Sequence, residues 1–363
     1  MKHALLVLAL ILFYQGPAGA GNETVVRIAI EPQPVLIERS SSAQAVSFDF
    51  LLENVGAETA RVAKVELSVY DRSGKLELRK FLASSSLRHG DREIATLEPK
   101  ASLFFMNPFE SFAPQIDLTK MQYTFYFEAK EGQKESSSSV TITPVEFRAK
   151  TRLQLPLKGR LLVHDGHDFY SHHRRFNLGH PFLKEIKVTH NFTRYASDLC
   201  VVNEQGELRR NQSNANTDWY GFGATVYAPG AGRVLRVRGD SPDNINGEST
   251  FTLDEFRKDP TMPAGNFIII DHLNGEFSLM AHLKQGSVIV REGMMVRAGQ
   301  PLAEMGVSGD AYLPHVHYEL RNAGEVNALG LPAYFQNFIR ILGVRRIPVT
   351  VGPVDSGDVL VSR

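Results

Sequence analysis

Two histidines separated by a single residue, His315 and His317, lie in a segment whose flanking residues alternate as in a β-strand. Side chains at positions i and i+2 of a strand point to the same face, so both imidazoles can reach one site. Neutral imidazole binds zinc well, and a catalytic zinc ion typically takes three protein ligands and one water. The pair alone is weak support for a metal site, because histidines also take this spacing by chance in cores and on surfaces.

The composition limits the kinds of site that the chain can build. The single cysteine, Cys200, excludes an intramolecular disulfide framework and any multi-cysteine zinc or iron–sulfur site. The 40 Lys and Arg residues balance the 40 Asp and Glu residues, which gives no electrostatic reason to expect a nucleic-acid or acidic-membrane partner. Ten of the 12 histidines fall between His164 and His317. We therefore look for chemistry built from histidine and carboxylate ligands in the C-terminal half.

Short strands and glycine-rich turns surround the histidine pair. Residues 265–272 read as a strand that has an apolar run at 267–270, ends in His272 and is followed by an Asn-Gly turn. Residues 278–283 form the next strand, with His282 near its end. Glycines then punctuate the chain as far as His315. Short strands with few helical stretches predict a compact, mostly antiparallel β domain.

The order of these motifs resembles that of the lysostaphin-type zinc metallopeptidases, which are bacterial endopeptidases that cut peptidoglycan peptides. The resemblance covers residues 225–321 and a short upstream piece, Arg-Tyr-Ala-Ser-Asp at 194–198. It includes Ala-His-Leu around His282 and the His-x-His pair. It implies zinc-dependent hydrolysis of peptide bonds in peptidoglycan crosslinks or stem peptides, in an open groove over a β-sheet.

The resemblance also implies a role for each matched residue. His317 and Asp198 would bind a single zinc ion, while His315 would stay off the metal and act with His282 on the substrate. The zinc ion would keep one coordination position for water, lower the pKa of that water and polarise the scissile carbonyl. His272, in the family's Asp-His turn, would be structural.

The third metal ligand does not follow directly from the pattern. Many relatives carry a histidine four residues before the aspartate, and Arg194 holds that place here. Some secreted relatives place a His-Arg-Arg stretch farther upstream, which favours His173 as the ligand. His190 is the alternative to His173, and His172 comes third. If His173 binds the metal, residues 176–189 must form an excursion that returns to the site.

The N-terminal half has the period-two alternation of antiparallel strands. Apolar and polar residues alternate in 46–50, in 65–69 and in 123–127, with turn residues between the runs. We expect an immunoglobulin-like β-sandwich over about residues 24–147. Because it carries no clustered metal ligands, we expect a spacer or docking module that could bind a protein partner. The predicted fold class is therefore mainly β, with this sandwich followed by an antiparallel β catalytic domain of the lysostaphin type.

The first 20 residues have the features of a secretory signal peptide. A basic start and an apolar run of 11 residues precede Ala18-Gly19-Ala20, which predicts cleavage after Ala20 and a secreted or periplasmic protein. The apolar run is too short for a membrane-spanning helix, which needs about 20 residues. No later run of 18 apolar residues occurs, so we expect no integral membrane segment.

These observations divide the chain and leave other functions open. The predicted division is a signal peptide at 1–20, the sandwich at 24–147, the zinc metallopeptidase domain at 150–345 and a C-terminal tail at 346–363. Two polar segments, 200–223 and 239–264, look inserted into the metallopeptidase domain as lids or as plain surface loops. The alternative functions are a non-catalytic cell-wall-binding or regulatory protein on the same fold, and an adhesin or assembly factor led by the sandwich.

Overall fold

The computed structural model describes residues 26–362, apart from 41, 90–91, 94, 129–135, 170, 212, 214, 250 and 326. The described chain divides into two compact units. The first comprises the residues up to Phe147 together with Asn177–Thr189, and the second comprises Arg148–Phe176 and the residues from His190 onward. The predicted signal peptide, residues 1–20, lies outside the described residues. No helix in the described part of the chain is long and apolar enough to cross a membrane.

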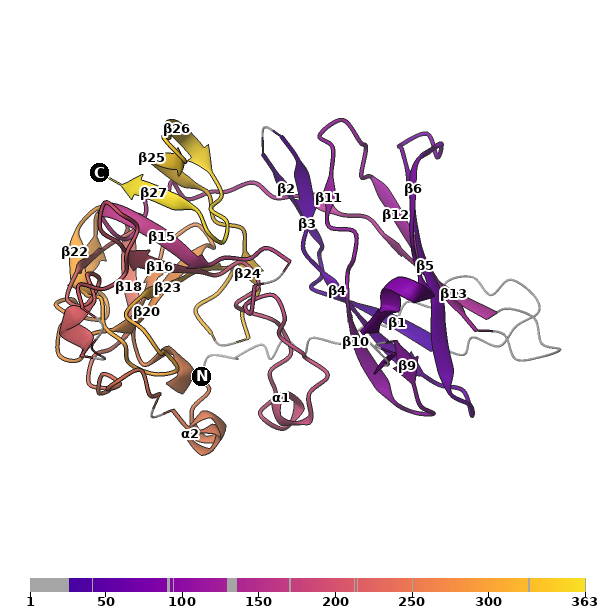
Figure 1. Cartoon of the computed structure of the whole chain (residues 1–363), viewed down its shortest axis with the longest axis horizontal. Coiled ribbons are helices and arrows are strands. Elements are labelled where there is room, and N and C mark those ends of the chain that lie inside the picture. Colours follow the sequence, from indigo (N-terminus) through magenta and orange to yellow (C-terminus); the bar gives the residue numbers. More distant parts are fainter. Residues whose placement is uncertain are drawn as a thin grey trace, which may run out of the picture. The chain divides into compact units, whose positions relative to one another are not determined.

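The first unit is a β-sandwich of three larger sheets (Figure 1). One sheet has the order β1 (Val26–Glu31), β4 (Asp49–Asn54), β10 (Ser102–Met106). The second has the order β11 (Ser111–Phe112), β3 (Gln44–Val46), β2 (Leu36–Arg39), β14 (Val145–Glu146). The third has the order β13 (Ser136–Ile142), β12 (Lys120–Phe127), β5 (Ala60–Tyr70), β6 (Leu76–Ala83), and β9 (Thr96–Leu97) also pairs with β5. The remaining elements are the pair β7 (Arg88–His89) and β8 (Arg92–Glu93), the 3-10 helix η1 (Ser84–Leu87) and α1 (Pro181–Glu185).

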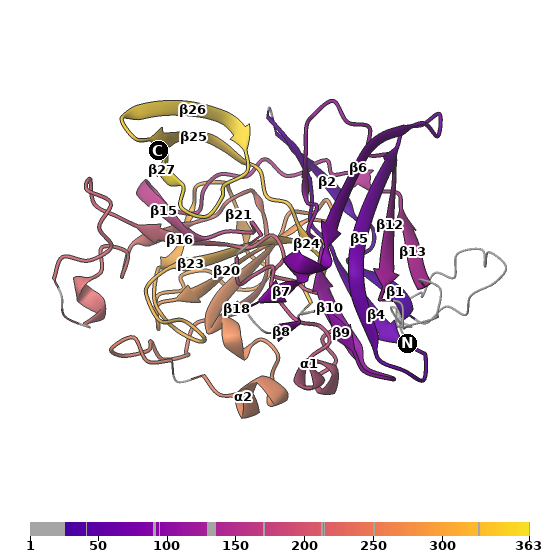
Figure 2. The same cartoon turned by 45° about the vertical axis from the view of Figure 1, so that its right-hand side comes forward.

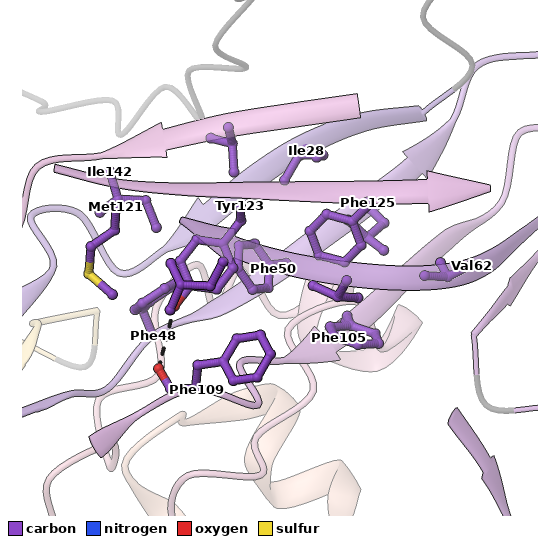
Figure 3. Packing of buried hydrophobic residues seen from close by; sticks show 14 of the residues in the cluster. Ile28, Phe48, Phe50, Val62, Phe105, Phe109, Met121, Tyr123, Phe125 and Ile142 are labelled. Atoms are coloured by element: carbon purple, nitrogen blue, oxygen red, sulfur yellow. Dashed lines mark hydrogen bonds between the residues drawn. The ribbon is translucent and has the colours of Figure 1, made fainter. Parts of the chain in front are cut away.

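The period of two in the sequence turns every second side chain into the core of this sandwich. In β12 the side chains of Met121, Tyr123, Phe125 and Phe127 are buried, and the residues between them are partly exposed. The ring of Phe50 packs edge-on against Tyr123 and Phe125, with ring centroids 5.0 Å and 5.1 Å apart (Figure 3). The predicted mainly β fold built from antiparallel sheets is confirmed, with β2 and β14 as a parallel pair.

The second unit is built on one 11-stranded antiparallel sheet (Figure 2). Its order is β21 (Met295–Val296), β18 (Gly232–Arg238), β19 (Asn266–Asp271), β20 (Phe277–Leu283), β23 (Val316–Arg321), β16 (Ser197–Val201), β15 (Gly159–Asp165), β27 (Val359–Ser362), β25 (Phe335–Leu342), β26 (Arg345–Gly352), and β24 (Gly330–Leu331) also pairs with β23. β17 (Thr225–Tyr227) and β22 (Pro301–Glu304) form a separate pair. The helices are α2 (Leu253–Lys258) and the 3-10 turns η2 (Asn216–Asp218) and η3 (Met262–Ala264).

Three middle strands of this sheet, β20, β23 and β16, lie side by side and are buried along almost their whole length (Figures 1 and 2). Asp198 of β16 lies opposite His317 of β23, and His317 in turn lies opposite Ala281 of β20. Directly opposed residues of an antiparallel pair share a face of the sheet. The register of these strands therefore places Asp198 beside His317, with His282 one residue beyond Ala281.

The division of the chain differs from the predicted one at two places. No boundary separates residues 346–362, as far as the structure describes them, from the sheet, because β26 pairs with β25, and β27 pairs with both β15 and β25. The alternating residues of this segment complete ladders of the sheet, so they form part of the second unit. Within the predicted excursion, Asn177–Thr189 belongs to the first unit and not to the predicted metallopeptidase domain.

Replacing Phe50 with Ala should lower the free energy of unfolding of the first unit by about 3–5 kcal/mol, because it removes a fully buried ring from an aromatic cluster. Urea unfolding followed by circular dichroism measures the change. Phe81→Ala is the control, since Phe81 is 67% exposed and its loss should cost less than about 0.5 kcal/mol. Equal unfolding midpoints for the two variants would contradict the assigned core.

Candidate metal centre

Three side chains with metal-binding atoms converge at the middle of the sheet of the second unit. Asp198 lies on β16, His317 lies on β23, and His173 comes from the loop between β15 and β16. Their ligand atoms all lie within 4.8 Å of one another, and all three residues are buried. Asp198 Oδ1 is 2.9 Å from His317 Nδ1 and 3.3 Å from His173 Nε2. A carboxylate oxygen between two imidazole nitrogens suits a divalent cation such as zinc.

The second ring nitrogen of each of these histidines is hydrogen-bonded, which decides the nitrogen that faces Asp198. His173 Nδ1 donates to the carbonyl oxygen of Gly166 at 2.8 Å, so its Nε2 carries the lone pair. His317 Nε2 donates to Glu319 Oε1 at 2.8 Å, which leaves Nδ1 facing the aspartate. The buried Nε2 of His173 has no hydrogen-bond partner in the described part of the chain. An orphaned, buried lone pair beside a carboxylate is the feature that a bound metal ion would explain.

The backbone of His173 is held from both sides of the excursion. Before it, Ser171 Oγ accepts a hydrogen bond from the His173 backbone N–H at 3.1 Å and donates to the Gly166 carbonyl. After it, the Asn191 amide and the Thr193 hydroxyl donate to the His173 carbonyl at 2.9 Å and 3.0 Å. The loop is therefore closed by hydrogen bonds between residues that flank Asn177–Thr189.

The charges around the centre keep its carboxylates ionised. Burial raises the pKa of Asp198, but the neighbouring imidazoles of His173 and His315 and the hydrogen bond from His317 hold this pKa well below its usual value. Burial also raises the pKa of Glu319, yet Arg321 and His317 lower it to about 2. Burial lowers the pKa of His317, but the hydrogen bonds to Asp198 and Glu319 raise it to about 9. A cation bound at this centre would displace the proton that His317 otherwise holds.

Two further buried histidines, His282 and His315, border these ligands. Their ring centroids are 4.6 Å apart, and His315 Nε2 is 3.5 Å from Asp198 Oδ1. His282 Nδ1 donates to the carbonyl of Ser308 at 2.8 Å, and His315 Nδ1 donates to the carbonyl of Leu313 at 2.9 Å. Burial lowers the pKa of both rings, so each is neutral near pH 7 with its lone pair on Nε2. Both rings can therefore accept a proton beside the metal ligands.

His282 has a backbone conformation that is unusual for a histidine. Its φ is +60°, in the left-handed region that favours glycine, and this conformation costs an L-residue about 1–2 kcal/mol. The carbonyl of His282 accepts a hydrogen bond from Gly306 N at 3.1 Å. Residues in such conformations gather at functional sites, where the surrounding structure holds them.

The structure brings His173, rather than His190 or His172, to the carboxylate of Asp198. Among the described residues, the group of possible metal ligands that includes Asp198 contains His173 and neither His190 nor His172. The side chain of His172 is 64% exposed and turns its Nδ1 to Asp165.

His272 and Cys200 lie in structural surroundings. Both ring nitrogens of His272 are engaged, Nδ1 with the carbonyl of Ala231 at 2.8 Å and Nε2 with the hydroxyl of Ser278 at 2.7 Å. Cys200 is buried, and burial raises the pKa of its thiol, so it does not offer a thiolate ligand.

Sequence reasoning missed Glu319 and Arg321, which extend the centre along β23. Glu319 accepts the Nε2 proton of His317 through one oxygen and contacts Arg321 Nε through the other, and both charged residues are buried. His315, His317, Glu319 and Arg321 alternate along the chain, so they face the same side of the sheet. The signal that could have found them is the continuation of this alternation beyond the His-x-His pair.

Replacing Glu319 with Gln should weaken the binding of a divalent ion about 10- to 100-fold, because a neutral amide makes His317 a weaker base. Titration calorimetry of the metal-free protein with zinc measures the affinity. Glu204→Gln, at an exposed glutamate of the same unit, is the control and should leave the affinity unchanged. A folded Glu319→Gln variant with wild-type affinity would contradict this role.

Comparison with known proteins identifies part of the second unit. Residues 217–328 match the profile described as Peptidase family M23. The chain is 31% identical over 99 residues to the peptidoglycan DD-endopeptidase ShyB of Vibrio cholerae, which is 27% of this chain and 18% of that protein. It is 36% identical over 61 residues to the murein hydrolase activator EnvC of Escherichia coli, which is 17% of this chain and 14% of that protein. The chain therefore spans less than a fifth of the length of either relative.

Solved structures of similar proteins include that of pseudoalterin, an M23 metalloprotease from the deep sea. It is 15% identical, with a TM-score of 0.28, and the match covers 57% of this chain and 99% of that chain. The family match at 217–328 includes His282, His315 and His317, whereas His173 and Asp198 lie upstream of it. Through residues 217–328, this chain contains a domain of peptidase family M23, the lysostaphin type.

Proposed function

We propose that this chain is a zinc-dependent endopeptidase that hydrolyses peptide bonds in peptidoglycan crosslinks or stem peptides. The M23 domain and the similarity to a peptidoglycan DD-endopeptidase support this proposal. The observation that carries it is geometric. His282 and His315, each with its lone pair on Nε2, border a buried group of His173, Asp198 and His317.

The donor set fits one zinc ion. Two imidazoles and one carboxylate are ligands that zinc prefers, and three protein ligands leave one position for water. His173 Nε2, a carboxylate oxygen of Asp198 and His317 Nδ1 would hold the ion. When bound, zinc supplies a water of lowered pKa and polarises the scissile carbonyl.

His282 and His315 would perform the proton transfers. Because burial keeps both rings neutral, Nε2 of either ring can accept a proton from the attacking water. The protonated ring can then stabilise the developing oxyanion by a hydrogen bond or return the proton to the leaving amine. The carbonyls of Ser308 and Leu313 keep the Nδ1 protons in place, so each ring exchanges protons through Nε2.

A second candidate function is regulation of other cell-wall hydrolases without catalysis, and the similarity to a murein hydrolase activator favours it. The presence of all five candidate site residues supports the enzyme instead. In either case we propose export of the chain after cleavage at Ala20, to the periplasm or beyond, with the N-terminal sandwich as a binding site for a protein partner. Peptidoglycan peptides would be the substrate of the enzyme.

Replacing His173 with Ala should abolish stoichiometric zinc binding, because it removes one of three ligands from a buried centre. His190→Ala is the matched variant, at the other candidate ligand, and should retain one zinc ion per chain. Mass spectrometric metal analysis of the purified, folded proteins measures both. Zinc in the first variant and none in the second would reverse the ligand assignment.

His282→Ala and His315→Ala should keep the zinc ion and lower the rate of peptidoglycan hydrolysis about 10²- to 10⁴-fold, because each removes a group that transfers protons. Analysis of the peptides released from purified peptidoglycan measures the rate. His172→Ala, at the exposed neighbouring histidine, should keep both properties. A wild-type protein that binds zinc, cuts nothing and speeds a second hydrolase would instead support the regulatory function.

A further inference from the structure

One loop supplies the acceptors for both histidines that border the metal ligands. Within residues 306–313, the carbonyl of Ser308 accepts from His282 Nδ1, and the carbonyl of Leu313 accepts from His315 Nδ1. A hydrogen bond at one ring nitrogen decides both the orientation of an imidazole and the nitrogen that carries its proton. The position of this loop therefore controls the geometry of both rings.

The inserted segment 239–264 holds this loop through Asn244. Asn244 is 1% exposed, and its side-chain amide donates to the carbonyls of Gly309 and Ala311, each at 2.8 Å. The backbone N–H of Asn244 donates to the carbonyl of Val307 at 3.1 Å. Both amide hydrogens and the backbone N–H are thus directed at the same loop.

Other residues at the two ends of the inserted segment add to this contact. Asp243 Oδ1 accepts from the backbone N–H of Val307 at 2.8 Å, and the Pro263 carbonyl accepts from the backbone N–H of Asp310 at 2.8 Å. Next to Pro263, the backbone is so close to the loop that a Cβ atom on Gly309 would lie 2.4 Å from the nitrogen of Gly265. The segment therefore supports the loop from beside it.

We propose that Asn244 is a positioning residue, which fixes the orientation and the tautomer of His282 and His315 by holding residues 306–313. It acts through the carbonyls of the loop and not on the substrate. The kinetic consequence of this inference rests on the proposed hydrolase function, whereas its structural consequence does not.

An asparagine suits this position because its amide nitrogen carries two donors at short reach. Without them, the carbonyls of Gly309 and Ala311 lose their Asn244 donor, and a buried carbonyl without a partner is costly. Ser249 Oγ also donates to the Gly309 carbonyl at 3.2 Å, so the loss falls most heavily on Ala311, which is buried. We expect the loop to shift toward other donors, and the acceptors of both histidine rings to shift with it.

The test is Asn244→Ala in the full-length, zinc-loaded protein, with Asn203→Ala as the matched control. Asn203 accepts hydrogen bonds from the backbone N–H groups of Gln205 and Glu207 within its own turn, so the control removes a similar number of bonds elsewhere in the second unit. Two-dimensional nuclear magnetic resonance spectra of nitrogen-15-labelled imidazoles report the tautomer of each ring. His282→Gln and His315→Gln assign the signals, and zinc content, kcat and KM are measured on the same preparations.

In the wild-type protein we expect only the tautomer with the proton on Nδ1 for both rings. Asn244→Ala should give a mixture of tautomers and lower kcat about 10- to 100-fold, with KM and zinc content unchanged. Asn203→Ala should change none of these. Wild-type ring spectra in a folded Asn244→Ala protein would overturn the inference. If that variant does not fold, Asn244→Ser, which retains one donor, is tested in its place. Wild-type ring spectra in folded Asn244→Ser would likewise overturn the inference.

Failure of the proposed function has a different signature. If the wild-type protein does not hydrolyse peptidoglycan, kcat cannot be compared between the variants. The ring spectra alone then test the role of Asn244. Altered spectra with unaltered hydrolysis would overturn the kinetic part of the inference and leave the hydrolase function standing.

Discussion

The carboxylate of Asp198 is buried in the middle of a sheet, and a buried charge must be compensated for the fold to be stable. His317, His173 and His315 present nitrogens to one of its oxygens at 2.9, 3.3 and 3.5 Å. Compensation therefore comes from the proton of His317 or from a cation between the three nitrogens. His173 precedes His315 and His317 by more than a hundred residues of chain. Their shared contact with Asp198 therefore joins β16, β23 and the loop after β15, which are distant in the sequence.

The direction of each imidazole is decided by the acceptor at its other nitrogen. Three of the four acceptors are backbone carbonyls, those of Gly166 for His173, Ser308 for His282 and Leu313 for His315. The fourth acceptor is the buried carboxylate of Glu319, which accepts from His317. A backbone carbonyl cannot be replaced by substitution at its own residue, so the chemistry of the site depends on where loops are held. Residues distant from the metal ligands, such as Asn244, can therefore affect the proton positions as strongly as the ligands' immediate neighbours.

Features that depend on neighbouring residues in the sequence could be predicted, and features that depend on distant pairing could not. The period of two identified the strands of the sandwich and placed His315 and His317 on one face, because strand geometry is local. The preference for His173 over His190 came from the resemblance to the family, because no local pattern shows the path of Asn177–Thr189. The pairing of β27 with β15 joins segments about 200 residues apart, which no local pattern shows. Glu319 continues the alternation of His315 and His317, so a local pattern is sufficient to place it on the same face of the strand.

Asn177–Thr189 leaves the second unit between His173 and Asp198 and belongs to the first, so the chain crosses between the units three times. A domain joined by a single linker can be exchanged between proteins by recombination at that linker. Here the exchange of the first 147 residues alone would remove the packing partners of a segment that connects two of the candidate metal ligands. We therefore expect the two units to have been inherited together, with the sandwich evolving as part of the metal-binding protein and not as an interchangeable module.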